Sequence, residues 1–302
     1  MSNTAPEVRI VEVGPRDGLQ NEKAIIPADT KIALIDRLSA CGFSVVEATS
    51  FVSPKWVPQL ADAEQVLPAI TRTSGVQYPV LVPNEKGLER AILVGAREIA
   101  VFTAASDAFN LRNINCDTSE SLRRIEPVIA TAKKQGISVR GYVSTVLGCP
   151  YQGDVPLADV VRVTRALHDM GCHEVSLGDT IGVGTPARAR AMLEACASQV
   201  PMQNLAVHFH DTYGQALANV LTCLEAGVRV VDSSVGGLGG CPYAKGASGN
   251  LASEDLVYML HGQGMTTGVD LDELCETAIW ISAELGRKPA SKLGQVVLAQ
   301  RD

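Results

Sequence analysis

Short runs of apolar, often β-branched residues recur along this 302-residue chain, with stretches of helical pattern between them. The eight runs cover residues 8–13, 44–49, 76–82, 98–103, 138–145, 174–177, 205–210 and 228–233. Strands that are almost continuously apolar and alternate with helices are typical of a parallel sheet covered on both faces. Eight such units predict that the α/β fold is a closed (β/α)8 TIM barrel.

The stretches between the runs carry the usual helix boundaries. They include residues 28–40, 83–94, 118–135, 157–170, 186–199, 213–226 and 253–260. Pro186 stands in a first turn, and Gly136 and Gly227 follow directly after helix ends. An open, doubly wound sheet is the alternative, but no G-x-G-x-x-G motif follows the first run.

No low-complexity tract or flexible linker divides the chain, so we expect residues 1–302 to form a single catalytic domain. The barrel should cover about residues 8–262. A C-terminal helical extension should cover about residues 263–302, with an extra helical pair within residues 269–285.

The charge and the cysteines limit the possible partners and compartments. A net charge of -7 and a pI near 5.3 leave no general basic face for nucleic acid or for a membrane surface. The N-terminus is short and polar, without a signal-peptide pattern, and no apolar run is long enough to span a bilayer. The eight cysteines are scattered without a C-x-x-C pair, which favours a reducing, cytoplasmic location.

The active site of such a barrel lies at the C-terminal ends of its strands. His208 and His210 are two residues apart in the seventh run and therefore face the same side. Asp17, after the first run, adds an oxygen donor. This mixed set indicates a site for Mg2+ or Mn2+, or for Co2+ or Zn2+, and lacks the thiolates of structural zinc. One strand histidine is more often a core residue, so the prediction depends on the pair.

Other charged residues also stand at strand ends. Arg16 could form an ordinary salt bridge, or could stabilise an oxyanion such as an enolate beside a metal. Glu47, on the second run, could orient that arginine. Asp179 follows the sixth run and could act as a base or contact substrate, and a structural role is equally open.

Cys241 lies in a glycine-rich segment after the eighth run. The glycines are Gly236, Gly237, Gly239 and Gly240. Most free cysteines are small buried hydrophobic residues, but these glycines predict a loop that could close over a substrate and bring in a thiol. A nucleophile would need a base, and a metal-bound histidine cannot serve, so the pattern favours a general acid.

Five segments together closely resemble the hydroxymethylglutaryl-CoA lyases, which belong to a wider group of metal-dependent barrel lyases and acyl-CoA condensing enzymes. They are residues 13–22 (VGPRDGLQNE), 47–55 (EATSFVSPK), 176–180 (SLGDT), 208–214 (HFHDTYG) and 239–243 (GGCPY). The likeness runs from about residue 8 to residue 260. The cysteine segment separates the lyases from their condensing relatives.

The resemblance implies metal-assisted cleavage of 3-hydroxy-3-methylglutaryl-CoA to acetyl-CoA and acetoacetate, as in leucine degradation. The implied ligands of Mg2+ or Mn2+ are Asp17, His208, His210 and Asn250. The implied catalytic residues are Cys241, Arg16, Asp179 and Glu47, and the implied substrate-binding residues are Arg16, Lys23 and Gly240. Arg16 would stabilise the acetyl-CoA enolate and Cys241 would protonate it. The base is open between a water and Asp179, with His208 a weaker choice.

Three alternatives remain: a lyase for a longer branched CoA ester of the same type, a condensing synthase, and a non-catalytic metal or ligand sensor. Only about forty residues follow the eighth unit, which argues against the synthase. The chain carries Gly236 where many relatives have alanine. Its C-terminus has no cysteine, so we expect no thiol cross-linking. The sequence also shows neither a peroxisomal tripeptide nor a mitochondrial leader. The extra helices favour a homodimer.

Overall fold

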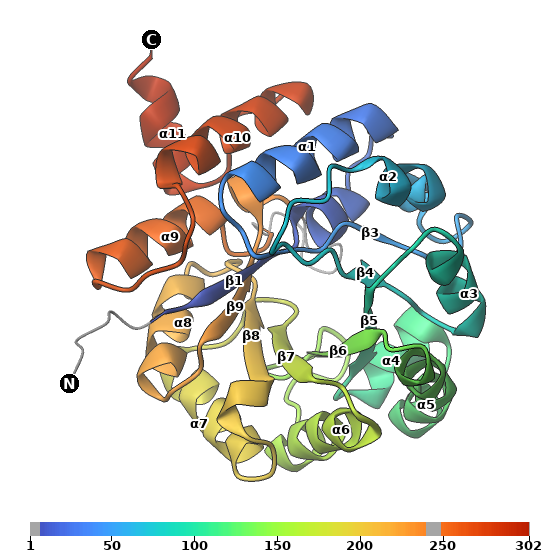
Figure 1. Ribbon diagram of the computed structural model, residues 1–302. Coiled ribbons are helices and arrows are strands. Elements are labelled where there is room, and N and C mark those ends of the chain that lie inside the picture. Colours follow the sequence, from blue (N-terminus) through green and yellow to red (C-terminus); the bar gives the residue numbers. More distant parts are fainter. Residues whose placement is uncertain (1–6, 240–248, 302) are drawn as a thin grey trace, which may run out of the picture.

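The computed structural model describes residues 7–239 and 249–301, in which parallel strands form a ring inside a layer of helices (Figure 1). The strands are β1 (Arg9–Glu12), β2 (Val45–Val46), β3 (Thr49–Ser50), β4 (Val80–Leu81), β5 (Glu98–Ala104), β6 (Ser138–Ser144), β7 (Glu174–Asp179), β8 (Leu205–Phe209) and β9 (Val230–Ser233). All the strand pairs are parallel, and the strands neighbour one another in the order β2-β1-β9-β8-β7-β6-β5-β4-β3.

The strands at the two ends of that order, β2 and β3, are consecutive halves of one predicted run, interrupted at Glu47 and Ala48. The Glu47 amide donates to the Glu12 carbonyl on β1 at 2.8 Å, while the Ala48 amide donates to the Pro79 carbonyl at 2.9 Å. The interruption therefore bonds to both neighbours and closes the ring. The predicted (β/α)8 barrel is confirmed.

Helices follow the strands and cover the outside of the ring. They are α1 (Ala28–Ala40), α2 (Ala63–Ala69), α3 (Glu85–Leu93), α4 (Asp107–Ile114), α5 (Thr118–Lys134), α6 (Leu157–Met170), α7 (Pro186–Ala197), α8 (Ala216–Glu225), α9 (Ser253–Gly262), α10 (Leu271–Glu284) and α11 (Lys292–Ala299). Their ends follow local rules: Asp117, for example, accepts the Glu120 amide at 2.7 Å and caps α5.

The C-terminal helices differ from the prediction in one respect. Residues 269–285 hold one helix, α10, and not a helical pair, because Leu274, Ala278 and Ile281 repeat without a break along its buried side. The second helix, α11, begins later, at Lys292. In Figure 1, α10 lies beside α1 and α9, so the extension packs onto the start and the end of the barrel.

The inside of the barrel holds polar side chains beside two small apolar clusters, while its outside is apolar. On β7, Val175 and Leu177 join the core beneath the helices, whereas Ser176 between them bonds to Asp232 across the interior. The same alternation turns His208 inward on β8, between Val207 and Phe209 of the outer core. The strands thus direct charged and hydrogen-bonding groups into the interior of the ring.

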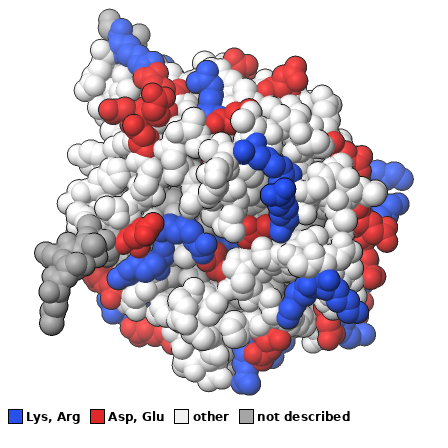
Figure 2. All heavy atoms as spheres, in the orientation of Figure 1, with Lys and Arg blue, Asp and Glu red and all other residues white. Residues whose placement is uncertain are grey.

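On the face drawn in Figure 2, basic and acidic side chains are interspersed, and neither sign forms a broad patch. Within residues 7–239 and 249–301, each helix is too short or too polar to cross a membrane.

Candidate active site

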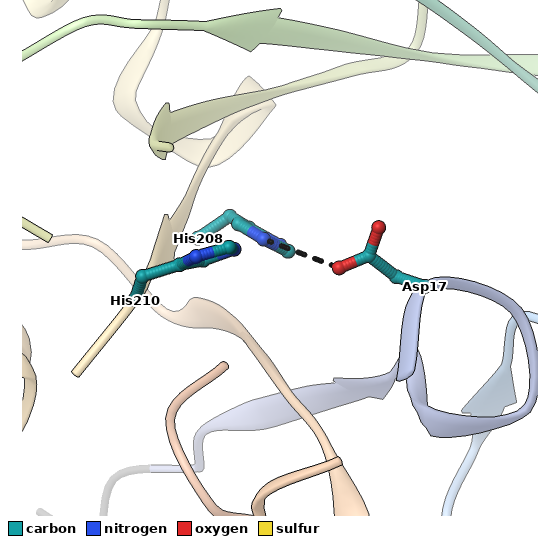
Figure 3. A group of neighbouring side chains, drawn as sticks. All are labelled: Asp17, His208 and His210. Atoms are coloured by element: carbon teal, nitrogen blue, oxygen red, sulfur yellow. Dashed lines mark ion pairs between the residues drawn. The ribbon is translucent and has the colours of Figure 1, made fainter. Parts of the chain in front are cut away.

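Asp17, His208 and His210 each bring a possible ligand atom to within 4.8 Å of one another (Figure 3). Asp17 lies in η1 (Gly14–Gly18), a single turn directly after β1. His208 lies on β8, and His210 follows its last residue. Two segments almost two hundred residues apart in sequence therefore meet at the C-terminal end of the barrel, as predicted.

Glycines permit the tight turn that places Asp17. A Cβ on Gly14 would lie 2.6 Å from the Glu12 carboxylate, and a Cβ on Gly18 would lie 2.8 Å from the Leu238 side chain. Larger residues would push η1 away from the segment that follows β9. The two glycines that flank Pro-Arg-Asp thus let η1 pack closely against β1 and the segment that follows β9.

The two histidines have different surroundings. His208 Nε2 lies 4.0 Å from Asp17 Oδ2, and its Nδ1 lies 3.2 Å from Asp232 Oδ2. The Nδ1 of His210 is buried and has no hydrogen-bond partner among the described residues. Burial and the neighbouring His208 lower the pKa of His210 to about 4, so its ring is neutral at neutral pH. A neutral imidazole is the form that binds metal.

Asn250 completes the cluster. A β-bridge joins His210 to Asn250, and the Asn250 side-chain amide donates to Asp17 Oδ2 at 2.8 Å and to the Leu238 carbonyl at 3.2 Å. Its Oδ1 is buried and without a hydrogen-bond partner in the described part of the chain. A buried amide oxygen costs free energy unless something donates to it or binds it, as a cation would.

The donor set fits a divalent cation. It offers two imidazoles, one carboxylate and one amide oxygen, a mixed nitrogen and oxygen set that can hold a divalent metal ion. Burial alone would raise the pKa of Asp17, but Arg16 and the two histidines outweigh it and hold the pKa at about 2. The carboxylate therefore stays ionised at any physiological pH.

Arg16 joins this cluster to Glu47. Its Nη1 donates to Asp17 Oδ1 at 2.7 Å and its Nη2 lies 2.8 Å from Glu47 Oε2. The Tyr142 hydroxyl also donates to Glu47 Oε2, at 3.1 Å, and the Tyr142 ring lies 5.4 Å from the guanidinium. Glu47 is fully buried, and burial raises its pKa although Arg16 opposes the shift. Arg16 is thus a fixed cation at the edge of the cluster.

Asp179 has the surroundings expected for a structural role. It is fully buried, and its carboxylate accepts the amides of Gly184 at 2.7 Å and Val183 at 3.3 Å. A Cβ on Gly184 would lie 2.8 Å from Asp179 Oδ2, so the loop closes on the carboxylate. Its catalytic role stays a prediction. Asp211 is likewise engaged, since it accepts the Ala216 amide at 2.9 Å near the start of α8.

Of the remaining predicted residues, Lys23 is the one that the structure describes. Lys23 is exposed in the segment between η1 and α1, on the side of the barrel that carries the cluster. Gly240 and Cys241 lie outside the described residues, so their roles stay predictions.

Sequence reasoning missed a buried charge network below the cluster. Arg140 on β6 donates to Asp232 Oδ1 at 2.7 Å and to Glu174 Oε1 at 2.7 Å, and Asp232 in turn contacts His208. Arg140 also lies over the Tyr142 ring, 4.8 Å from its centroid. The signal was present, because a charged residue inside an apolar strand needs a buried partner of opposite charge.

Comparison with known proteins gives one consistent result. Residues 7–281 match the family model described as HMGL-like. The mitochondrial hydroxymethylglutaryl-CoA lyase of Bos taurus is 61% identical over 96% of this chain and 89% of its own length. The crystal structure of hydroxymethylglutaryl-CoA lyase from Pseudomonas aeruginosa is 55% identical, with a TM-score of 0.96 over 98% of this chain and 99% of that one. An HMG-CoA lyase from Acinetobacter baumannii, solved in complex with coenzyme A and 3-methylmalate, is 38% identical, with a TM-score of 0.93 over 98% and 96% of the two chains.

Proposed function

This chain belongs to the HMGL-like family of hydroxymethylglutaryl-CoA lyases, and from that premise we propose that it cleaves 3-hydroxy-3-methylglutaryl-CoA to acetyl-CoA and acetoacetate. The observation in the structure that supports this most strongly is the buried cluster of neutral and anionic donors beside a fixed guanidinium. A lyase of this kind needs a cation near the hydroxyl that loses its proton, and a second positive group where the enolate forms.

The residues that would hold the cation are Asp17, His208, His210 and Asn250, and Mg2+ or Mn2+ suits them. When bound, the cation supplies positive charge that lowers the pKa of the C3 hydroxyl of the substrate. Asp17 contributes the one negative charge of this set, and the Asn250 amide holds that carboxylate in place at 2.8 Å.

Arg16 would offset the charge that develops when the bond between C2 and C3 breaks. The electron pair of that bond passes into the thioester and forms the acetyl-CoA enolate, while the former alcohol carbon becomes the ketone of acetoacetate. Glu47 and Asp17 hold the Arg16 guanidinium from two sides at 2.8 and 2.7 Å, so little reorganisation is needed as charge develops. We assign Glu47 to orienting Arg16.

Cys241 would return a proton to C2 of the enolate and so release acetyl-CoA. We assign substrate binding to Arg16, Lys23 and Gly240. The base that removes the hydroxyl proton would be a water or Asp179. His208 is the weaker choice, because its Nδ1 already faces Asp232 and its Nε2 faces the cation site.

The first experiment incubates the purified protein with 3-hydroxy-3-methylglutaryl-CoA and Mg2+, or with EDTA in place of the metal. Acetyl-CoA and acetoacetate are quantified together. We expect equimolar products that disappear on chelation. Absence of cleavage by protein with demonstrably bound metal would reject this substrate, and would direct the assay to longer branched CoA esters and then to condensation.

The setting of this activity follows as a further part of the proposal. Residues 1–302 would form one catalytic domain. Its compartment would be a reducing cytoplasm, because the described cysteines are all free. Leucine degradation, which produces this substrate, would be its metabolic role. We also propose a homodimer, which light scattering coupled to gel filtration would test.

A further inference from the structure

Asp232 contacts three side chains in the barrel interior. It is almost fully buried on β9. Arg140 donates to Oδ1 at 2.7 Å and to Oδ2 at 3.1 Å, and the Ser176 hydroxyl donates to Oδ2 at 2.8 Å. The fourth contact is His208 Nδ1, 3.2 Å from Oδ2. Because a guanidinium grips both oxygens, the group is an ionised carboxylate, which can only accept hydrogen bonds.

The Asp232 carboxylate beside Nδ1 decides which tautomer the His208 ring adopts. Nδ1 must carry a proton in order to bond to Asp232, so in the neutral ring the lone pair lies on Nε2. Nε2 is the atom that faces Asp17, at 4.0 Å. The contact on one side of the ring thus sets which nitrogen is available on the other.

His210 provides an internal contrast. Its Nδ1 is equally buried but has no partner among the residues that the structure describes. Of the two histidines in the cluster, His208 is therefore the one whose tautomer and ring orientation the described protein fixes.

We propose that Asp232, held by Arg140 and Ser176, is a positioning residue that fixes the Nδ1-protonated tautomer of His208 and presents Nε2 to the divalent cation. This inference rests on the proposed function, because it assigns His208 to the metal. Carboxylates that orient metal-binding histidines are general in metalloproteins, and their loss weakens metal binding about 10- to 100-fold. The chain from Glu174 through Arg140 and Asp232 to His208 spans the barrel interior.

The test compares two alanine variants that each remove one of the two carboxylates bonded to Arg140. Asp232→Ala removes the one that also contacts His208, while Glu174→Ala removes the one that does not. Mn2+ affinity is measured by titration calorimetry on protein without substrate. We expect Asp232→Ala to weaken Mn2+ binding about 10- to 100-fold and Glu174→Ala to leave it near the wild-type value. Equal affinities in the two variants, whether both weakened or both unchanged, would overturn the proposal.

A second measurement keeps both carboxylate partners of the buried Arg140, so it does not depend on whether the alanine variants fold. Wild-type protein labelled with 15N in its histidines is studied by NMR with Mg2+ bound, and a His208→Gln variant identifies the His208 signals. We expect the proton on Nδ1. A proton on Nε2 would refute the assignment. Both measurements are independent of cleavage, so a failure of the proposed reaction and a failure of this inference would be seen separately.

Discussion

At the residue scale, Arg16 joins two carboxylates with one planar group. Its two terminal nitrogens lie 2.7 Å from Asp17 and 2.8 Å from Glu47, so two separate donors of one rigid plane hold two carboxylates, whereas lysine offers a single nitrogen. We therefore expect Arg16→Lys to lower kcat roughly 100- to 1,000-fold, the usual loss when a donor to a developing oxyanion is removed. Steady-state kinetics at saturating metal measure this.

The matched control is Arg37→Lys. Arg37 also stacks on an aromatic ring, Trp280 at 4.5 Å, but it does so between α1 and α10, away from the cluster. This control should keep the wild-type kcat. If Arg16→Lys kept it as well, charge alone would suffice and the two-sided hold on the guanidinium would have no catalytic value.

The proposed proton donor can be tested without knowledge of its surroundings. If Cys241 is the general acid, Cys241→Ser should lower turnover by roughly two to four orders of magnitude, because a hydroxyl is a much weaker acid than a thiol. Metal affinity, measured by calorimetry, should stay nearly intact, since sulfur is absent from the ligand set. A parallel loss of metal binding and turnover would instead give Cys241 a structural role.

What the sequence could show of the site depended on where each residue stands along its strand, because residues at the C-terminal ends of barrel strands gather at one end. The spacing of His208 and His210, and the position of Asp17 after a strand, were enough to predict that they meet. Asp232 and Arg140 were missed because they lie inside β9 and β6, and their pairing depends on which strands face each other across the ring. A local pattern cannot supply that information.

At the scale of elements, the sequence predicted the strands well, because apolar β-branched runs are a strong local signal. It could not show that the second strand is interrupted at Glu47. There the Glu47 side chain holds Arg16, while the Glu47 amide bonds to Glu12 and the next amide, of Ala48, bonds to Pro79 on the other side. The C-terminal helices were misplaced because α10, which Asp270 caps, runs without a break where it packs against α1 and η4 (Val235–Gly237).

Gly239 and Gly249 approach each other closely. A Cβ on Gly249 would lie 1.2 Å from the carbonyl oxygen of Gly239, and Asn250 follows directly. Gly249→Ala should therefore separate the two backbones and displace Asn250 from Asp17. We expect a loss of roughly 1–3 kcal/mol in the free energy of unfolding, together with weaker Mn2+ binding.

Thermal melts and Mn2+ titration measure both effects. Gly262→Ala is the control, because a Cβ there meets nothing within 4 Å and the residue lies in α9. It should match the wild type or stabilise the helix slightly. Wild-type metal affinity in Gly249→Ala would show that the close approach does not position Asn250.

At the scale of the whole molecule, buried carboxyls outside the metal cluster make stability depend on pH. Burial raises the pKa of Glu12 to about 7 and that of Glu254 to about 8. Both groups hold η4 in place: Glu12 Oε1 accepts the Val235 amide at 2.9 Å, and Glu254 Oε1 accepts the Gly236 amide at 2.7 Å. The same contacts that anchor this segment therefore couple the fold to protons.

The sign follows from the direction of the shift. Between pH 4.5, the ordinary pKa of a glutamate side chain, and the folded value of about 8, the folded chain keeps the proton on Glu254 while the unfolded chain releases it. Stability from this group is fully present below pH 4.5 and is lost as the pH rises toward 8. Other buried groups add their own slopes, so the test must isolate Glu254 by substitution.

Glu254→Gln keeps an oxygen to accept the Gly236 amide but cannot ionise. We expect its Tm to fall less than the wild-type Tm as the pH rises from 4.5 to 8, with a difference of a few degrees between the two slopes. Melts at constant ionic strength measure this. Glu194→Gln, which removes an exposed carboxylate from α7, should keep the wild-type slope. If Glu254→Gln kept that slope too, Glu254 would be ionised in the folded protein. The buried oxygen that has no described partner would then need a donor outside the described residues.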